Sequence, residues 1–108
     1  MNVMHYADSQ PVDLGGGVTR RILAYNEGIM MVEVAMETGG IGTPHTHPHV
    51  QSSYVRSGKF RFTIDGKDVE VTEGDTLVFP SGILHGTVCL EKGVLIDIFA
   101  PMREDFLK

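Results

Sequence analysis

Four residues that can bind a metal lie close together in the sequence, at His45, His47, His49 and Gln51. Neutral imidazole is the side chain most often used to bind first-row transition metals, and a glutamine amide adds a neutral carbonyl oxygen. On an extended strand alternate residues share a face, so His45 and His47 can point into the same cavity. Another histidine, His85, follows a Pro-Ser-Gly turn and opens a new apolar run. These residues predict a metal site built from two distant segments.

We expect His45, His47 and His85 to bind the metal, because three imidazoles buried together would be costly to desolvate without partners. His49 is out of phase with the other histidines, and it can line the pocket, orient a ligand or face the solvent. Gln51 either binds the ion or only forms hydrogen bonds inside the protein. As a ligand it would leave the full charge of the ion in place, which favours Lewis-acid chemistry over redox chemistry.

A second group of chemically capable residues lies near the end of the chain. On a strand, Asp97 and Phe99 project to one face while Ile96 and Ile98 project to the other. This places a carboxylate where an apolar residue would be the default. Arg103 follows a proline, so it could fold back over a cavity mouth and offer a bidentate fork to a carboxylate. The alternatives are a solvated aspartate at a strand end and an arginine on the surface.

The elements that must position these residues are strands. Short runs rich in β-branched and aromatic residues are separated by glycine turns, and no stretch has sustained apolar residues at helical spacing. The clearest hairpin joins 60–64 to 67–71 through Asp65-Gly66, which suits a type I′ turn. Its alternation predicts one buried face, made of Phe60, Phe62, Ile64, Val69 and Val71.

Six further strands are expected, at 18–25, 29–36, 52–56, 76–79, 84–90 and 94–99. Glycine-containing turns separate them, among them 57–58 and 92–93. So many short strands at regular spacing indicate an all-β fold, a small barrel or jelly-roll sandwich with an interior face for a ligand. The tail after Pro101 is expected to form a short helical turn or a strap.

Composition limits the classes of function. The 108 residues, 42% hydrophobic, suit one domain over 1–108. A formal charge of -5 and the lack of a basic cluster argue against a nucleic-acid partner. No apolar segment resembles a signal peptide or a membrane span, so we expect a cytoplasmic protein with no membrane partner. Cys89 is the single cysteine and is expected to fill the core.

Two spaced motifs resemble those of the cupin superfamily, and the resemblance covers 18–106. The first, glycine, His-x-His, glutamate and glycine, is matched by Gly39, His45, His47, Gln51 in place of the glutamate, and Gly58. The second, glycine, Pro-x-Gly, histidine and asparagine, is matched by Gly74, Pro80, Gly82, His85 and, in place of the asparagine, Cys89. The resemblance implies a single-domain cupin whose barrel motifs lie within 39–89.

The chain also resembles the KdgF-like pectin-degradation proteins, a cupin subfamily that linearises unsaturated monouronates. The matching stretches are 17–23, 30–34, 45–51 with 53–55, and 97–106, whereas Val50 and Ser52 depart from the subfamily. The resemblance implies a metal site at His45, His47, Gln51 and His85. It also implies substrate-binding or catalytic roles for Asp97, Phe99 and Arg103.

The implied activity is metal-dependent ring opening of a 4,5-unsaturated monouronate, from pectin or a related polyuronide, to 5-keto-4-deoxyuronate. The metal would be a divalent transition ion such as nickel, zinc, manganese or iron, the partner a small anionic sugar, and the assembly a homodimer. Two alternatives remain open at this point. One is a metal-dependent dioxygenase acting on a small carbonyl compound, and the other is a non-catalytic cupin that binds a sugar or carboxylate.

Overall fold

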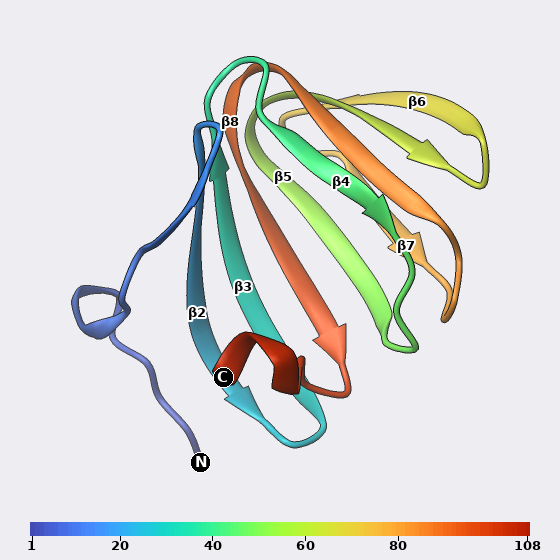
Figure 1. Cartoon of the computed structure of the whole chain (residues 1–108). Coiled ribbons are helices and arrows are strands. Elements are labelled where there is room, and N and C mark those ends of the chain that lie inside the picture. The colour runs from blue at the N-terminus through green and yellow to red at the C-terminus, as the bar shows by residue number, and fades with distance from the viewer.

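The protein is built almost entirely of strands (Figure 1). The computed structural model describes residues 1–108. The elements are η1 (Tyr6–Asp8), β1 (Val12–Gly15), β2 (Val18–Asn26), β3 (Ile29–Met36), β4 (Ile41–His45), β5 (Val50–Ile64), β6 (Lys67–Thr72), β7 (Thr76–Phe79), β8 (His85–Ala100) and η2 (Glu104–Leu107). The two helical turns have three and four residues, and neither they nor any other helix could cross a membrane.

Two long strands, β5 and β8, lie at the centre of the fold and pair with each other antiparallel from Val50 to Ile64. The strand order is β1-β2-β3-β8-β5-β6, with β4 also paired to β8 and β7 also paired to β5. Each long strand changes its outer neighbour halfway: β8 pairs first with β4 and then with β3, and β5 first with β7 and then with β6. The sheet therefore curves over on itself around an interior, as Figure 1 shows, and the expected jelly-roll architecture is confirmed.

The bend in the two long strands depends on two glycines that face each other. Gly58 has a positive φ of 83°, and a Cβ at this position would lie 2.5 Å from the carbonyl oxygen of Lys92. A Cβ on Gly93 would overlap the carbonyl oxygen of Ser57. Only glycine allows this approach, and the register of the β5–β8 ladder shifts here. The prediction of chain-reversing turns at these glycines is wrong, because both strands continue through them as bulges.

The hairpin between β5 and β6 forms as predicted at its turn, where Asp65 and Gly66 have positive φ values of 50° and 80°. Phe60 and Phe62 are buried on its inner face, but Val69 is 41% exposed. The expected burial of Val69 is wrong because β6 is an edge strand with β5 as its only sheet neighbour. The strands β1 and β4 were not predicted.

The larger hydrophobic core lies between the two halves of the curved sheet. Its nine buried members are Val18, Met36, Val55, Phe60, Phe62, Val71, Phe79, Cys89 and Leu95. Cys89 is fully buried and unpaired, in agreement with a core position. A smaller cluster of Met30, Val32 and Phe99 packs against the tail. The site described below lies between these two clusters.

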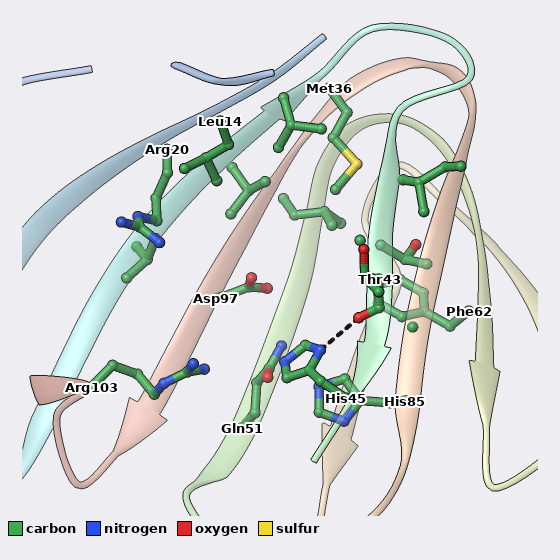
Figure 2. A pocket seen from close by; sticks show the side chains of 18 of the residues that line it. Leu14, Arg20, Met36, Thr43, His45, Gln51, Phe62, His85, Asp97 and Arg103 are labelled. Carbon is green, nitrogen blue, oxygen red and sulfur yellow. Dashed lines mark hydrogen bonds between the residues drawn. The ribbon is translucent and has the colours of Figure 1, made fainter. Parts of the chain in front are cut away.

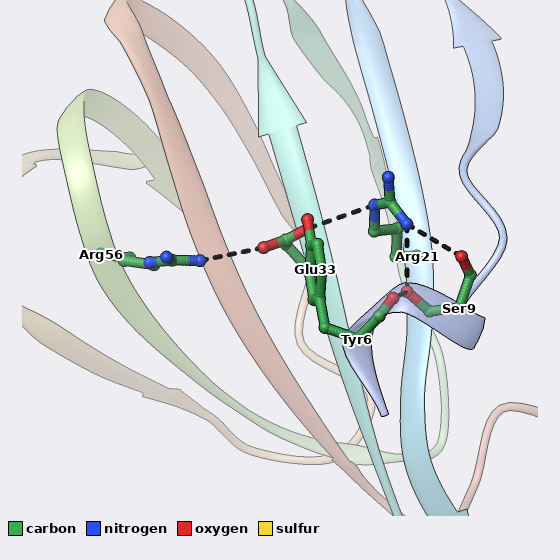
Figure 3. Close-up of polar contacts among 5 residues, drawn as sticks. All are labelled: Tyr6, Ser9, Arg21, Glu33 and Arg56. Atoms are coloured by element: carbon green, nitrogen blue, oxygen red, sulfur yellow. Dashed lines mark hydrogen bonds and ion pairs between the residues drawn. The ribbon is translucent and has the colours of Figure 1, made fainter. Parts of the chain in front are cut away.

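The outer face of the sheet carries a polar cluster that holds the N-terminal segment (Figure 3). Its centre is the buried carboxylate of Glu33, which accepts a hydrogen bond from the Tyr6 hydroxyl at 2.8 Å and pairs with Arg56 at 3.1 Å. Arg21 lies 3.7 Å from the same carboxylate and donates to the carbonyl oxygen of Ser9 at 2.9 Å. Every charged group in this cluster has a partner within the protein. The cluster therefore has a structural role, which is to hold the segment before β1 against the sheet.

Candidate metal centre and its cavity

A cavity of about 350 Å³ opens into the curved sheet and has two chemically different parts (Figure 2). This volume suits a small ligand, since ligand pockets begin at about 300 Å³. One part is apolar, and residues such as Val34, Met36 and Leu95 line it. The other part is polar, and its lining residues include Arg20, His45, Gln51, His85, Asp97 and Arg103. Polar groups converging in an otherwise apolar cavity are typical of a binding or active site.

Three of the predicted ligands form one cluster. Ligand nitrogens of His45, His47 and His85 all lie within 4.8 Å of one another. His45, at the end of β4, is directly opposite His85 in the β4–β8 ladder. His47 lies beyond the end of β4, so its approach to His45 comes from the loop and not from strand alternation as expected. His47 and His85 are buried, whereas His45 is exposed, which corrects the expectation that all three imidazoles are buried.

The protonation of the three rings is set by the backbone. In each ring Nδ1 lies 2.8–3.0 Å from a carbonyl oxygen two residues away in the chain. A carbonyl only accepts, so in the neutral form of each ring Nδ1 carries the hydrogen and Nε2 has a free lone pair. Burial lowers the pKa values of His47 and His85 and so favours the neutral form that binds metals. The Nε2 of His85 is buried and has no partner in the protein.

Gln51 supplies a stronger indication that a cation belongs here. Its Oε1 lies 3.0 Å from Nε2 of His47, although the hydrogen of that neutral ring is already on Nδ1. Two lone pairs therefore face each other, an arrangement that is repulsive unless a cation lies between them. The donor set of three imidazole nitrogens and one amide oxygen fits a divalent transition ion. The three histidines and Gln51 are thus the residues that could hold one.

A directional chain of hydrogen bonds connects Gln51 to the second group of predicted residues. The Gln51 amide donates to Oγ of Ser53 at 3.0 Å, and the Ser53 hydroxyl donates to Oδ1 of Asp97 at 2.7 Å. Because the Gln51 nitrogen faces Ser53, its oxygen faces the histidines. A glutamate at position 51 could not donate to Ser53, which gives a physical reason for glutamine here.

Asp97 lies on β8 directly opposite Ser53 on β5 and is buried. Burial raises the pKa of its carboxyl from 3.8 to about 6, even though hydrogen bonds from Ser53 and Gln51 and the charge of Arg103 act to lower it. A carboxyl with a pKa near the working pH can both give and take a proton. The prediction that Asp97 and Phe99 share the interior face is confirmed, since both line the cavity.

Arg103 folds back over the cavity as predicted and is only 8% exposed. Its guanidinium packs over the rings of Phe99 and Phe106, with Cζ 5.0 Å and 4.2 Å from their centroids. Its Nε and Nη2 both bind the carboxylate of Asp105, at 3.0 Å and 2.8 Å. The bidentate fork expected for a ligand is therefore occupied by a residue of the tail.

The chain matches known proteins over most of its length. The cupin domain family matches residues 32–99. The chain belongs to the cupin family. The pectin degradation protein KdgF of Dickeya dadantii (strain 3937) is 43% identical over 97 residues, 88% of each chain. The oxalate decarboxylase OxdC of Bacillus subtilis (strain 168) is 35% identical over 81 residues, which are 70% of this chain and 21% of that protein.

Solved structures agree with this assignment. An RmlC-like cupin from Shewanella frigidimarina NCIMB 400 superposes with a TM-score of 0.92 at 38% identity, covering 96% of this chain and 94% of that one. The KdgF from a Halomonas species superposes with a TM-score of 0.90 at 34% identity, covering 96% of both chains. The resemblance of this cupin to KdgF-like proteins, first seen in its motifs, is confirmed.

Three residues of this cupin occupy places that the sequence alone did not settle. His49 is outside the metal cluster, and its Nε2 donates to the carbonyl oxygen of Met102 at 3.1 Å, which ties the loop to the tail. Ser53 was missed, although it follows Gln51 by two residues on the same strand face. Arg20 was also missed, although it interrupts an inward apolar row on β2.

Proposed function

We propose that this cupin opens the ring of a 4,5-unsaturated monouronate, giving the linear 5-keto-4-deoxyuronate. The observation that carries the proposal is the buried carboxyl of Asp97, connected by hydrogen bonds through Ser53 to Gln51 beside the three-histidine cluster. The likeness to a protein described as a pectin degradation protein adds support, because such unsaturated acids are what a lyase leaves after it cuts pectin.

A divalent transition ion, such as nickel, zinc, manganese or iron, would be held by His45, His47, His85 and Gln51. When bound, it would supply Lewis-acid polarisation of an oxygen of the sugar. The glutamine adds no negative charge, so the ion keeps its full attraction for an anionic ligand. That short-range attraction matters because the protein as a whole carries a charge of -5.

The reaction requires one proton to move. The anomeric hydroxyl loses its hydrogen, the bond between C1 and the ring oxygen breaks to leave an aldehyde, and C4 gains a hydrogen as C5 becomes a ketone. Atoms and electrons balance, and no oxidant is needed. Asp97 would carry this proton, as acid towards C4 or as base towards the anomeric hydroxyl or a water. Phe99 would pack on the sugar and exclude water, and Arg103, two of whose nitrogens bind Asp105, would help to orient the anionic end through its charge.

The test is incubation of purified, metal-loaded protein with 4,5-unsaturated galacturonate. Loss of the conjugated enol-ether absorbance, with the linear keto acid identified by NMR, is the expected result. Asp97→Asn should lower the rate by about 10²- to 10⁴-fold while leaving bound metal unchanged, since none of the four candidate ligands is altered. A rate equal to that in buffer with metal bound would refute the proposal.

The same experiment distinguishes the alternatives. A dioxygenase would consume oxygen in proportion to substrate, whereas ring opening proceeds equally under nitrogen. A non-catalytic binding protein would bind the sugar and release it unchanged, and Asp97→Asn would then alter nothing in the product. The homodimer and the cytoplasmic location stay predictions, to be checked by light scattering and by fractionation of cells.

A further inference from the structure

We infer that Arg20 is a second cationic residue of the cavity and binds the carboxylate of the ligand, on the side away from the three histidines. Arg20 lines the same cavity as Asp97 and Arg103. In Figure 2 it points into the cavity from β2, and the Asp97 carboxylate lies between it and His45. The inference rests on the proposed function for the identity of the ligand, a uronate.

Arg20 occupies an inward position without a hydrogen bond or an ion pair in the protein, and the carboxylate of Asp105 acts on its charge only from beyond ion-pair distance. Its neighbour Arg21 faces the other side of β2, where Ser9 and Glu33 satisfy its guanidinium (Figure 3). By contrast, Nε of Arg20 is buried without any hydrogen-bond partner, and none of the five ion pairs of the protein involves Arg20. Leaving a buried charged donor unpaired is costly, so a partner from outside the chain is expected.

The other arginine of the cavity, Arg103, is already engaged by a residue of the tail. Two nitrogens of Arg103 bind Asp105, whereas no nitrogen of Arg20 has a hydrogen-bond partner in the protein, so Arg20 has more donors free for a ligand. The ring of Phe106 packs against both, with its centroid 4.0 Å from Cζ of Arg20 and 4.2 Å from Cζ of Arg103. Stacking uses the flat face of a guanidinium and leaves its edge free to donate, so Arg20 is held in place without being satisfied.

The placement also orients the ligand. In a 4,5-unsaturated uronate the carboxylate is on C5, next to C4, which takes up the proton. With the carboxylate on Arg20, the double bond lies towards Asp97, and the ring oxygen and anomeric hydroxyl extend towards the histidines. The carboxylate and the sugar oxygens are thereby assigned to opposite sides of the cavity.

Binding by titration calorimetry tests the inference without requiring turnover. The probes are D-galacturonate and its neutral primary amide, galacturonamide, added to metal-loaded protein. Wild type should bind the acid more tightly than the amide. Arg20→Gln should weaken binding of the acid by about 10- to 100-fold, the range for a lost charge-assisted hydrogen bond, and leave the amide unchanged. Lys67→Gln, which removes one positive charge from the exposed β5–β6 hairpin, is the matched control and should behave as wild type.

A merely structural role for Arg20, as a support for Phe106, predicts a different result. Acid and amide would then weaken together in Arg20→Gln, and this outcome overturns the inference. Unchanged binding of the acid, or a wild type that does not distinguish acid from amide, overturns it as well. If Arg20→Gln does not fold, Arg20→Lys is measured instead, because lysine keeps the charge and loses the two-pronged donor geometry. Weaker binding of the acid alone supports the inference. Equal weakening of acid and amide binding overturns it.

The inference and the proposed function can fail separately. Loss of acid selectivity in Arg20→Gln, in a protein that does not open the unsaturated ring, would support Arg20 as the carboxylate ligand and refute the reaction. If Arg20→Gln opens the ring with an unaltered KM and binds the acid as wild type does, the proposed function is supported and the role of Arg20 is refuted.

Discussion

Replacing Asp97 by asparagine should change how stability depends on pH, and the size of the change follows from the burial of this carboxyl. The pKa of Asp97 is raised to about 6 from its usual 3.8. Below pH 3.8 the group is protonated in both the folded and the unfolded chain and costs nothing. Above pH 6 it is ionised in both, and keeping the charge buried lowers the free energy of unfolding. A difference of about 2.2 pKa units corresponds to about 3 kcal/mol.

Asp97 therefore contributes most to the free energy of unfolding at low pH, and this contribution is lost as the pH rises through 6. Asparagine does not titrate, so the free energy of unfolding of Asp97→Asn minus that of wild type should grow with pH. We expect this difference to increase by about 2 kcal/mol between pH 4.5 and pH 7.5, most of the full range. If the hydrogen bond from Ser53 is lost or weakened in Asp97→Asn, the difference in the free energy of unfolding shifts by the same amount at every pH. Its dependence on pH is unchanged.

The assay is urea unfolding of chelator-treated protein at half-unit steps of pH. Burial lowers the pKa values of His47 and His85, so these residues destabilise the fold as the pH falls. Wild type and Asp97→Asn each contain these two histidines, so their effect cancels in the difference between the two free energies of unfolding. Asp8→Asn, the same chemical change at an exposed residue, is the control. A difference that stays constant across this range would show that the Asp97 carboxyl is not desolvated as described, and the reasoning about its proton transfer would fall with it.

Three further changes have definite expected outcomes. His85→Ala removes a buried nitrogen of the candidate metal site, so metal analysis by mass spectrometry should show less bound ion per chain; full retention would contradict the metal site. Ser53→Ala removes a hydrogen bond that lowers the pKa of Asp97, so the pH at which stability is lost should move upward from about 6, and a downward move would contradict this. Phe60→Ala empties a fully buried position and should cost about 3–5 kcal/mol in urea unfolding. Val78→Ala, at a 70% exposed position, should cost less than about 1 kcal/mol, and equal losses would contradict the assigned core.

The sequence was sufficient for features that depend on local spacing. The hairpin turn at Asp65-Gly66, the inward face of Asp97 and Phe99, and the joining of distant His45 and His85 follow from alternation and from motif order. Glycines were ambiguous, because Gly58 and Gly93 signal a turn as readily as a bulge. Only their close backbone approach in the folded chain distinguishes the two.

Residues whose role depends on strand register could not be predicted. Ser53 connects Gln51 to Asp97 only because the β5–β8 ladder places it opposite Asp97. Arg20 enters the cavity because β2 presents its alternate residues inward, and only its place between Val18 and Ile22 distinguishes it from Arg21 in the sequence. The position of His47 beyond β4 likewise depends on how the loop closes, which no periodicity describes.

The pairing of β5 and β8 has a consequence for how the site can move. Gln51, Ser53 and Asp97 lie on strands with neighbours on both sides, because β5 runs between β7 and β8 and this half of β8 runs between β3 and β5. Exposing an amide here requires two ladders to open, so hydrogen exchange at 51–53 and 95–98 should be among the slowest in the protein. The loop 46–49 belongs to no strand and opens at lower cost. On the proposed function, His47 would be the ligand that can move aside to let an ion enter or leave, while the Asp97 carboxyl would keep its place.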